Sequence, residues 1–150
     1  MHIFSGLDEF ESATGLELGP TDWFEVDQDR VDQFAAATDD HQWIHVDPIR
    51  AADGPFGGTI AHGLLTLSLL PRFMHQLYTV DNVAMAVNYG FNKVRFITPV
   101  AVGAKLRAQS RIEHVARVGE ALQATLVTTI EIEGAPKPAA VIESIVRYVA

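Results

Sequence analysis

The chain has 150 residues, of which 48% are apolar and 20% charged, a composition typical of a folded globular protein. A net charge of −8 at pH 7 argues against a nucleic-acid partner, and the absence of cysteine excludes disulfides, thiolate zinc sites and a cysteine nucleophile. The N-terminus has no signal-peptide pattern, and the longest apolar stretch (63–71) is far short of the roughly 20 residues that span a bilayer. We therefore expect one cytoplasmic domain over residues 1–150, with no membrane partner.

The first third of the chain predicts short extended pieces followed by a helix. Residues 16–18 and 23–26 have the pattern of short strands on either side of a Gly-Pro turn. Asp27 or Asp29 is a suitable N-cap for the helix that follows. Apolar residues at helical spacing give this helix one buried face, and it should end near Thr38.

The strongest helical signal follows a loop rich in glycine and proline (53–58). Apolar residues recur on nearly every side of a helix from Ile60 to Leu77, which predicts a buried helix whose apolar residues from Leu64 onward all belong to the core. Pro71 should kink or divide it, because its ring clashes with the carbonyl group four residues earlier.

The second half of the chain changes to a two-residue period. Alternating apolar and polar residues cover 93–98, 105–112, 122–132 and 141–149, with glycines between them. Because no helix separates these strands, the sheet should be mainly antiparallel. The sequence therefore predicts an α+β domain in which a long antiparallel sheet wraps around a central apolar helix, the arrangement of the hot-dog fold.

A polar segment, residues 38–48, lies between the two predicted helices. Asp40 and His45 are close enough along the chain for both to reach one water molecule, and one can accept a proton while the other donates one. The side-chain pKa of histidine, near neutrality, suits this role. Composition alone leaves the alternative that the acids are solvated loop residues and the histidine a packing residue.

The same segment resembles the signature of the MaoC-like, or type 2, enoyl-CoA hydratases. In that signature an aspartate and a histidine have the separation of Asp40 and His45, and an Asp-Pro such as 47–48 follows. The His-Gln-Trp-Ile-His stretch (41–45) is closest to the NodN-like branch of the family. Residues 54–63 and 88–103 are similar to the family's approach to its central helix and to its second strand.

This resemblance implies an (R)-specific enoyl-CoA hydratase, which adds water to a trans-2-enoyl-CoA and gives an (R)-3-hydroxyacyl-CoA in fatty-acid metabolism. Asp40 and His45 are then the catalytic pair. By position the amide of Gly63 is the candidate to hold the thioester oxygen, with a helix-packing glycine as the alternative, and His62 either lines the pocket beside it or caps or packs against the helix. Lys93 and Arg95 are weaker candidates to contact the phosphates of CoA. The resemblance also implies a homodimer and no cofactor other than the CoA of the substrate.

Two departures from the family pattern and three alternatives qualify this hypothesis. The family's usual glycine before the aspartate is Asp39 here, and its Asn-Pro is Gln42-Trp43. His41 and His45 have the i, i+4 spacing of a zinc helix, but the required glutamate is replaced by Gln42, so we expect no metal. A thioesterase on the same fold, or an acyl-CoA-binding protein without catalysis, remains the alternative function.

Overall fold

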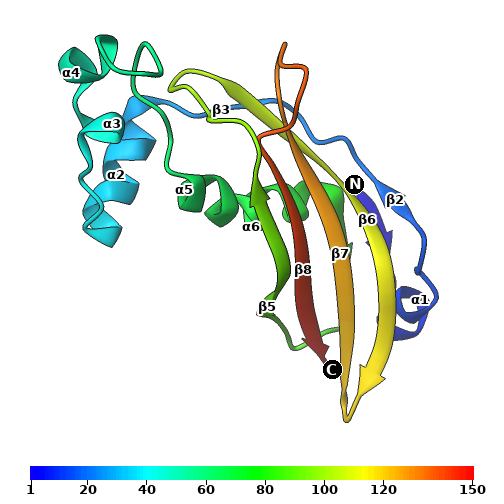
Figure 1. The fold of residues 1–150 in the computed structure, drawn as a ribbon. Coiled ribbons are helices and arrows are strands. Elements are labelled where there is room, and N and C mark those ends of the chain that lie inside the picture. The colour runs from blue at the N-terminus through cyan, green and yellow to red at the C-terminus, as the bar shows by residue number, and fades with distance from the viewer.

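A long antiparallel sheet dominates the computed structural model, which describes residues 1–150 (Figure 1). Its long strands come from the second half of the chain: β5 (Met85–Phe96), β6 (Lys105–Val118), β7 (Ala121–Ile132) and β8 (Ala140–Val149). Two short strands from the first half pair with β6, namely β2 (Glu17–Leu18) and β3 (Phe24–Glu25). The order β2-β6-β7-β8-β5 leaves β5 at an edge. A separate parallel pair joins β1 (His2–Phe4) to β4 (Tyr78–Val80).

The alternation in the sequence sets which face of the sheet is buried. On β7, every second residue from Leu122 to Ile130 is buried, and the register pairs most of these residues with buried residues of β6 and β8. Because successive side chains of a strand point to opposite faces, this pattern gives one dry and one wetter face. The prediction of an antiparallel sheet from the second half of the chain is confirmed.

The central helix begins later than predicted and is divided in two. Ile60, the predicted start, instead forms an isolated bridge with Ala101, and the helical pieces are α5 (Gly63–Ser68) and α6 (Leu70–Leu77). The division falls just before Pro71, because the proline ring clashes with a helix that continues through it. Pro71 therefore lies in the first turn of α6, where a backbone N–H has no partner within the helix and its absence costs nothing.

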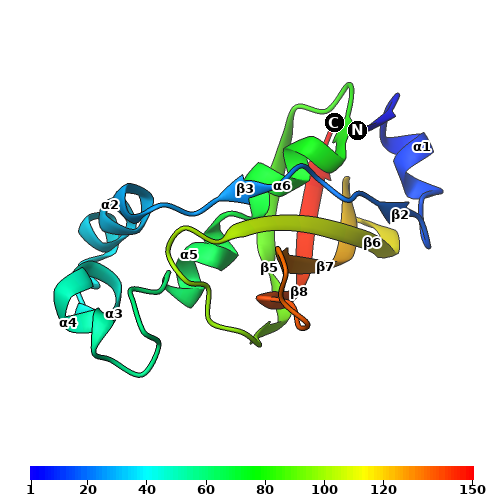
Figure 2. The same cartoon turned by 90° about the horizontal axis from the view of Figure 1, so that it is seen from above.

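The two helices follow one another along the inner side of the sheet (Figures 1 and 2). Leu65, Leu69 and Phe73 join the sheet residues in one of two apolar core clusters. The expectation that the whole apolar stripe is core is wrong at Leu64, whose side chain is 58% exposed. The helix packs against the sheet on one side only, so a residue on its other side stays uncovered within one chain.

The remaining helices are α1 (Leu7–Glu11), α2 (Gln28–Thr38), α3 (Trp43–Val46) and α4 (Pro48–Ala52). Helices α2–α4 form a group to one side of the sheet (Figure 1). Asp27 caps α2 by accepting a hydrogen bond from the backbone N–H of Arg30, as predicted. None of the helices has the length and apolar character needed to cross a membrane.

Candidate active site

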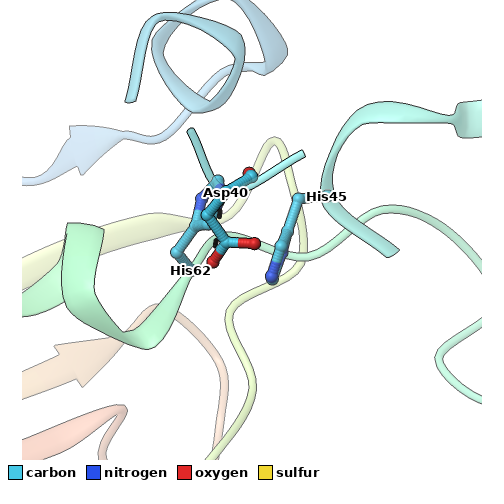
Figure 3. Close-up of side chains that lie close together, drawn as sticks. All are labelled: Asp40, His45 and His62. Carbon is cyan, nitrogen blue, oxygen red and sulfur yellow. Dashed lines mark hydrogen bonds and ion pairs between the residues drawn. The ribbon is translucent and has the colours of Figure 1, made fainter. Parts of the chain in front are cut away.

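The loop that joins α2 to α3 brings Asp40 next to His45. Helix α2 ends at Asp39, whose left-handed backbone (φ 59°) turns the chain. This is the position where the family pattern has glycine, and aspartate is among the few other residues that tolerate that conformation. The side chain of Asp40 is half exposed, whereas His45, on α3, is buried. Figure 3 shows both side chains together with His62.

His45 is held in one orientation by the backbone. Its Nδ1 lies 2.7 Å from the carbonyl oxygen of Ile60, and because a carbonyl only accepts hydrogen bonds, Nδ1 is the donor. The backbone N–H of Ile60 in turn donates to the carbonyl of Ile44, at 3.0 Å. In the neutral ring this leaves Nε2 of His45 unprotonated and able to accept a proton.

His62 packs against the side chain of His45 and does not line the cleft. Its ring is buried and stacks on that of His45, with 3.8 Å between ring centroids and 25° between planes. Its Nε2 donates to the backbone carbonyl of Asp40 at 3.0 Å and lies 3.9 Å from the carboxylate. Its Nδ1 is buried without a hydrogen-bond partner. His62 therefore holds the backbone of Asp40 in position through this hydrogen bond.

Asp40, His45 and His62 have ligand-type atoms within 4.8 Å of one another, a grouping that suggests a metal site. Imidazole lone pairs lie in the ring plane, and the two rings here are stacked nearly parallel, so their lone pairs do not converge on one ion. One nitrogen of each ring also already donates to a carbonyl oxygen. The geometry suits an acid–base group better than a metal centre. His41, which has the i, i+4 spacing of a zinc helix with His45, is not part of this cluster.

Sequence reasoning missed Gln28, which connects three parts of the site. Its Nε2 donates to the carbonyl oxygen of His45 at 2.7 Å and to Asp32 at 2.9 Å, and its Oε1 accepts from the hydroxyl of Thr59 at 2.7 Å. It thus ties α2 to α3 and to the loop before the central helix. A glutamine in the first turn of a helix is too ordinary to signal this role.

A cleft of about 350 Å³ opens beside His45. Its wall includes Gly63 and Thr66 of α5, Phe96 at the end of β5, and the segment 97–100. A Cβ at Gly63 would come within 3.1 Å of the Phe96 ring, so a larger residue would displace that ring or the helix start. Lys93 and Arg95 are exposed on β5 and do not line the cleft.

Comparison with known proteins identifies the family of this chain. Residues 9–135 match the protein family described as MaoC like domain. The chain belongs to the MaoC-like dehydratase family. It is 56% identical to 3-hydroxyacyl-thioester dehydratase Z of Mycobacterium tuberculosis, over the full length of both chains. It is 44% identical to Nodulation protein N of Rhizobium leguminosarum bv. viciae, over 93% of this chain and 88% of that protein.

Solved structures give the same result for the fold. The structure of an (R)-hydratase from A. caviae, described as involved in PHA biosynthesis, superposes with a TM-score of 0.73 at 26% identity. The match covers 89% of this chain and 94% of that one. The predictions of a hot-dog α+β fold, of the MaoC-like family with NodN-like relatives, and of an enzyme of the hydratase or dehydratase class are confirmed.

Proposed function

We propose that this MaoC-like protein is an (R)-specific hydratase that adds water to the double bond of trans-2-enoyl-CoA, and catalyses the reverse dehydration. One observation carries the proposal: the oriented ring of His45 lines a cleft that also contains Gly63, and the half-exposed carboxylate of Asp40 lies within 4.8 Å of a nitrogen of that ring. The names of the dehydratase Z relative and of the (R)-hydratase structure support the same reaction. The cytoplasm is the compartment that a CoA thioester substrate implies.

The chemistry follows from two groups that reach one water molecule. A carboxylate oxygen of Asp40 and a ring nitrogen of His45 are within 4.8 Å, a distance that a single bridging water can span. As the water oxygen bonds to the β-carbon, the pair removes one of its protons, and the electrons of the double bond move toward the thioester carbonyl. Return of a proton from the pair to the α-carbon completes the addition of one water, with atoms and charge balanced.

The negative charge that develops on the thioester oxygen needs a fixed donor. We assign this role to the backbone N–H of Gly63, at the start of α5 and in the wall of the cleft. The absence of a side chain there leaves room for the ring of Phe96 and for the approach of the carbonyl. His62 is a positioning residue in this scheme, because it contacts Asp40 and His45 and not the cleft.

The proposal includes a homodimer formed through the free edge of β5. This strand is exposed on both faces over almost its whole length, including Met85, Val87, Tyr89 and Phe91. A long exposed apolar edge strand favours pairing with another chain. We expect sedimentation to give twice the mass of one chain, and Phe91→Glu to shift it toward the monomer. A monomeric wild-type protein would contradict the dimer.

Lys93 and Arg95 lie on the same strand, four and two positions before the cleft residue Ile97, and neither forms an ion pair with an acid of this chain. We propose that they contact the phosphates of CoA. Replacing either by alanine should then raise KM for a CoA thioester, with less effect on kcat and a weaker dependence of KM on salt. An unchanged KM in both variants would remove them from the binding site.

The decisive test is incubation of the pure protein with crotonyl-CoA, following the conjugated enoyl thioester and free thiol in parallel. Loss of the enoyl signal without thiol is the expected result, and coupling to a dehydrogenase specific for one hand of 3-hydroxyacyl-CoA should identify the (R) product. Release of thiol would instead establish a thioesterase. Tight binding of several enoyl-CoA chain lengths without turnover of any would establish a binding protein.

A further inference from the structure

A second cavity lies farther along the central helix, between α6, β4 and the paired strands β5 and β8. Its volume is about 290 Å³, and it shares no lining residue with the cleft at His45. An engineered protein cavity of roughly 150 Å³ is known to hold benzene, so this one is large enough for a small organic group. Most of its wall is apolar and includes Leu70, Met74 and Val146.

One part of the wall is a pair of tyrosine hydroxyl groups. Tyr78 and Tyr148 both line the cavity, both are buried, and their oxygens are 2.5 Å apart. Two neutral phenols carry two hydroxyl hydrogens, and the bond between them uses one. That mutual bond is the only one that either hydroxyl makes within the chain. One buried hydroxyl hydrogen therefore lacks a protein acceptor, a condition that costs free energy unless the contents of the cavity provide one.

The absence of positively charged side chains from the wall limits the kind of chemical group that the cavity can bind. Neither lysine nor arginine lines the cavity, so it offers no fixed cation to a carboxylate or phosphate. Its other polar residues are Thr79, Asn88 and Ser144, which carry no charge, and His75, whose side chain is exposed. A neutral oxygen acceptor, such as a ketone, hydroxyl or ether, fits this wall better than an acid.

The catalytic cleft and the second cavity are lined by two successive helices, α5 and α6. Gly63 and Thr66 line the cleft, and Leu70 and Met74 of the next helix line the cavity. At about 1.5 Å per residue, Met74 is roughly 16 Å from Gly63 along the helix direction. An extended acyl chain with its thioester at Gly63 is long enough, at that separation, to place its distal end at the cavity.

We propose that the hydroxyl pair of Tyr78 and Tyr148 binds a neutral oxygen substituent near the distal end of the acyl chain. The inference rests on the proposed hydratase function and narrows its substrate to 2-enoyl, or 3-hydroxyacyl, thioesters that carry such an oxygen. A purely hydrocarbon chain in the same place leaves the free hydroxyl hydrogen without an acceptor, and this penalty gives the site its preference.

The test compares pairs of trans-2-enoyl-CoA substrates of increasing chain length. The two members of a pair differ only in that a ketone replaces one methylene near the end of the chain. In the wild-type protein kcat/KM should favour the ketone by about 10-fold at the chain length that reaches the cavity. In the double variant Tyr78→Phe/Tyr148→Phe the ratio should fall to about one. This variant removes donor and acceptor together, so it leaves no orphaned polar group to destabilise the fold.

The double variant Ser110→Ala/Thr128→Val is the matched control, because it removes another buried pair of bonded hydroxyls, from residues that do not line the cavity. The ketone preference should be unchanged in this variant. Equal kcat/KM for both members at every length in the wild type would overturn the proposal, and this comparison needs no variant to fold. Survival of the preference in the double variant would also overturn it. Failure of crotonyl-CoA to react would count against the hydratase function itself and is measured separately.

Discussion

The sheet and the group of helices α2–α4 are stabilised in different ways. The sheet and the central helix enclose two clusters of fully buried apolar side chains, in which residues such as Leu126, Ile130 and Ile142 have no exposed surface. Helices α2–α4 contribute few buried side chains, and many of their fixed contacts are hydrogen bonds. The carbonyl of Ile60 orients His45, the ring of His62 supports Asp40, and Gln28 ties the helices together.

Stability therefore depends mainly on the sheet, and catalysis depends mainly on the group of helices α2–α4. Burial of apolar area in the sheet supplies most of the free energy of folding. A polar group buried there without a hydrogen-bond partner lowers the stability of the fold. The helical group places its acid and its base at the margin of that core, where a carboxylate stays solvated and a histidine keeps one free nitrogen. Substitutions in the sheet should therefore change the free energy of unfolding, and substitutions in α2–α4 should change activity. Four measurements test this division.

The largest expected effect is on stability. Leu126→Ala removes a fully buried side chain from the middle of β7 and should lower the free energy of unfolding by about 2–5 kcal/mol. Denaturant titration measures the change, and activity per folded molecule should be close to that of the wild type. Val118→Ala, at an exposed position on β6, is the control and should change the free energy of unfolding by less than about 0.5 kcal/mol. Equal effects at both positions would contradict the proposed division.

The next effect is on the reaction. Asp40→Asn and His45→Gln should each lower kcat for hydration by at least about 100-fold, because each removes a positioned acid or base. The thermal unfolding midpoint should change little. Asp39→Asn and His41→Gln are matched controls, since both residues are exposed and both adjoin Asp40 in the chain. Full activity in Asp40→Asn and His45→Gln would exclude these residues from the mechanism.

A smaller effect is expected at Gln28, which does not touch the cleft but holds the segment that does. Gln28→Ala should lower kcat by about 10-fold and the free energy of unfolding by about 1 kcal/mol, because a loosened His45 backbone misplaces the ring. Gln33→Ala, on the exposed face of the same helix, should change neither. If both alanine variants keep full activity, Gln28 has only a structural role.

The smallest effect concerns pH. Burial raises the pKa of the Tyr78 and Tyr148 hydroxyls above the ordinary tyrosine value near 10. The folded protein thus holds these two protons more tightly than the unfolded chain does. Their contribution to stability is fully present below about pH 10 and is lost as the pH rises above it, because the unfolded chain ionises first.

Denaturant titrations of the wild type and of Tyr78→Phe/Tyr148→Phe, on either side of about pH 10, measure this contribution. The double variant should lose less stability than the wild type as the pH rises. Parallel curves for the two proteins would show that the pair does not contribute to the alkaline loss of stability.

The sequence by itself determined the long strands of the sheet, the helix that Asp27 caps and the family. A two-residue period requires one buried face of a strand, so the buried positions of β6 and β7 follow from their residues alone. Pro71 marked the division of the central helix for an equally local reason. Asp40 and His45 belong to one short segment, and their proximity was readable because few residues separate them.

Only the tertiary structure decided the contacts between distant segments. The exposure of Leu64 depends on which side of the helix meets the sheet, and the role of Gln28 depends on a loop 31 residues away. Tyr78 and Tyr148 are 70 residues apart, and strand pairing and helix packing alone bring their hydroxyls together. Periodicity records how side chains repeat within one element, whereas the position of one element on another depends on strand order and packing, which no local pattern encodes.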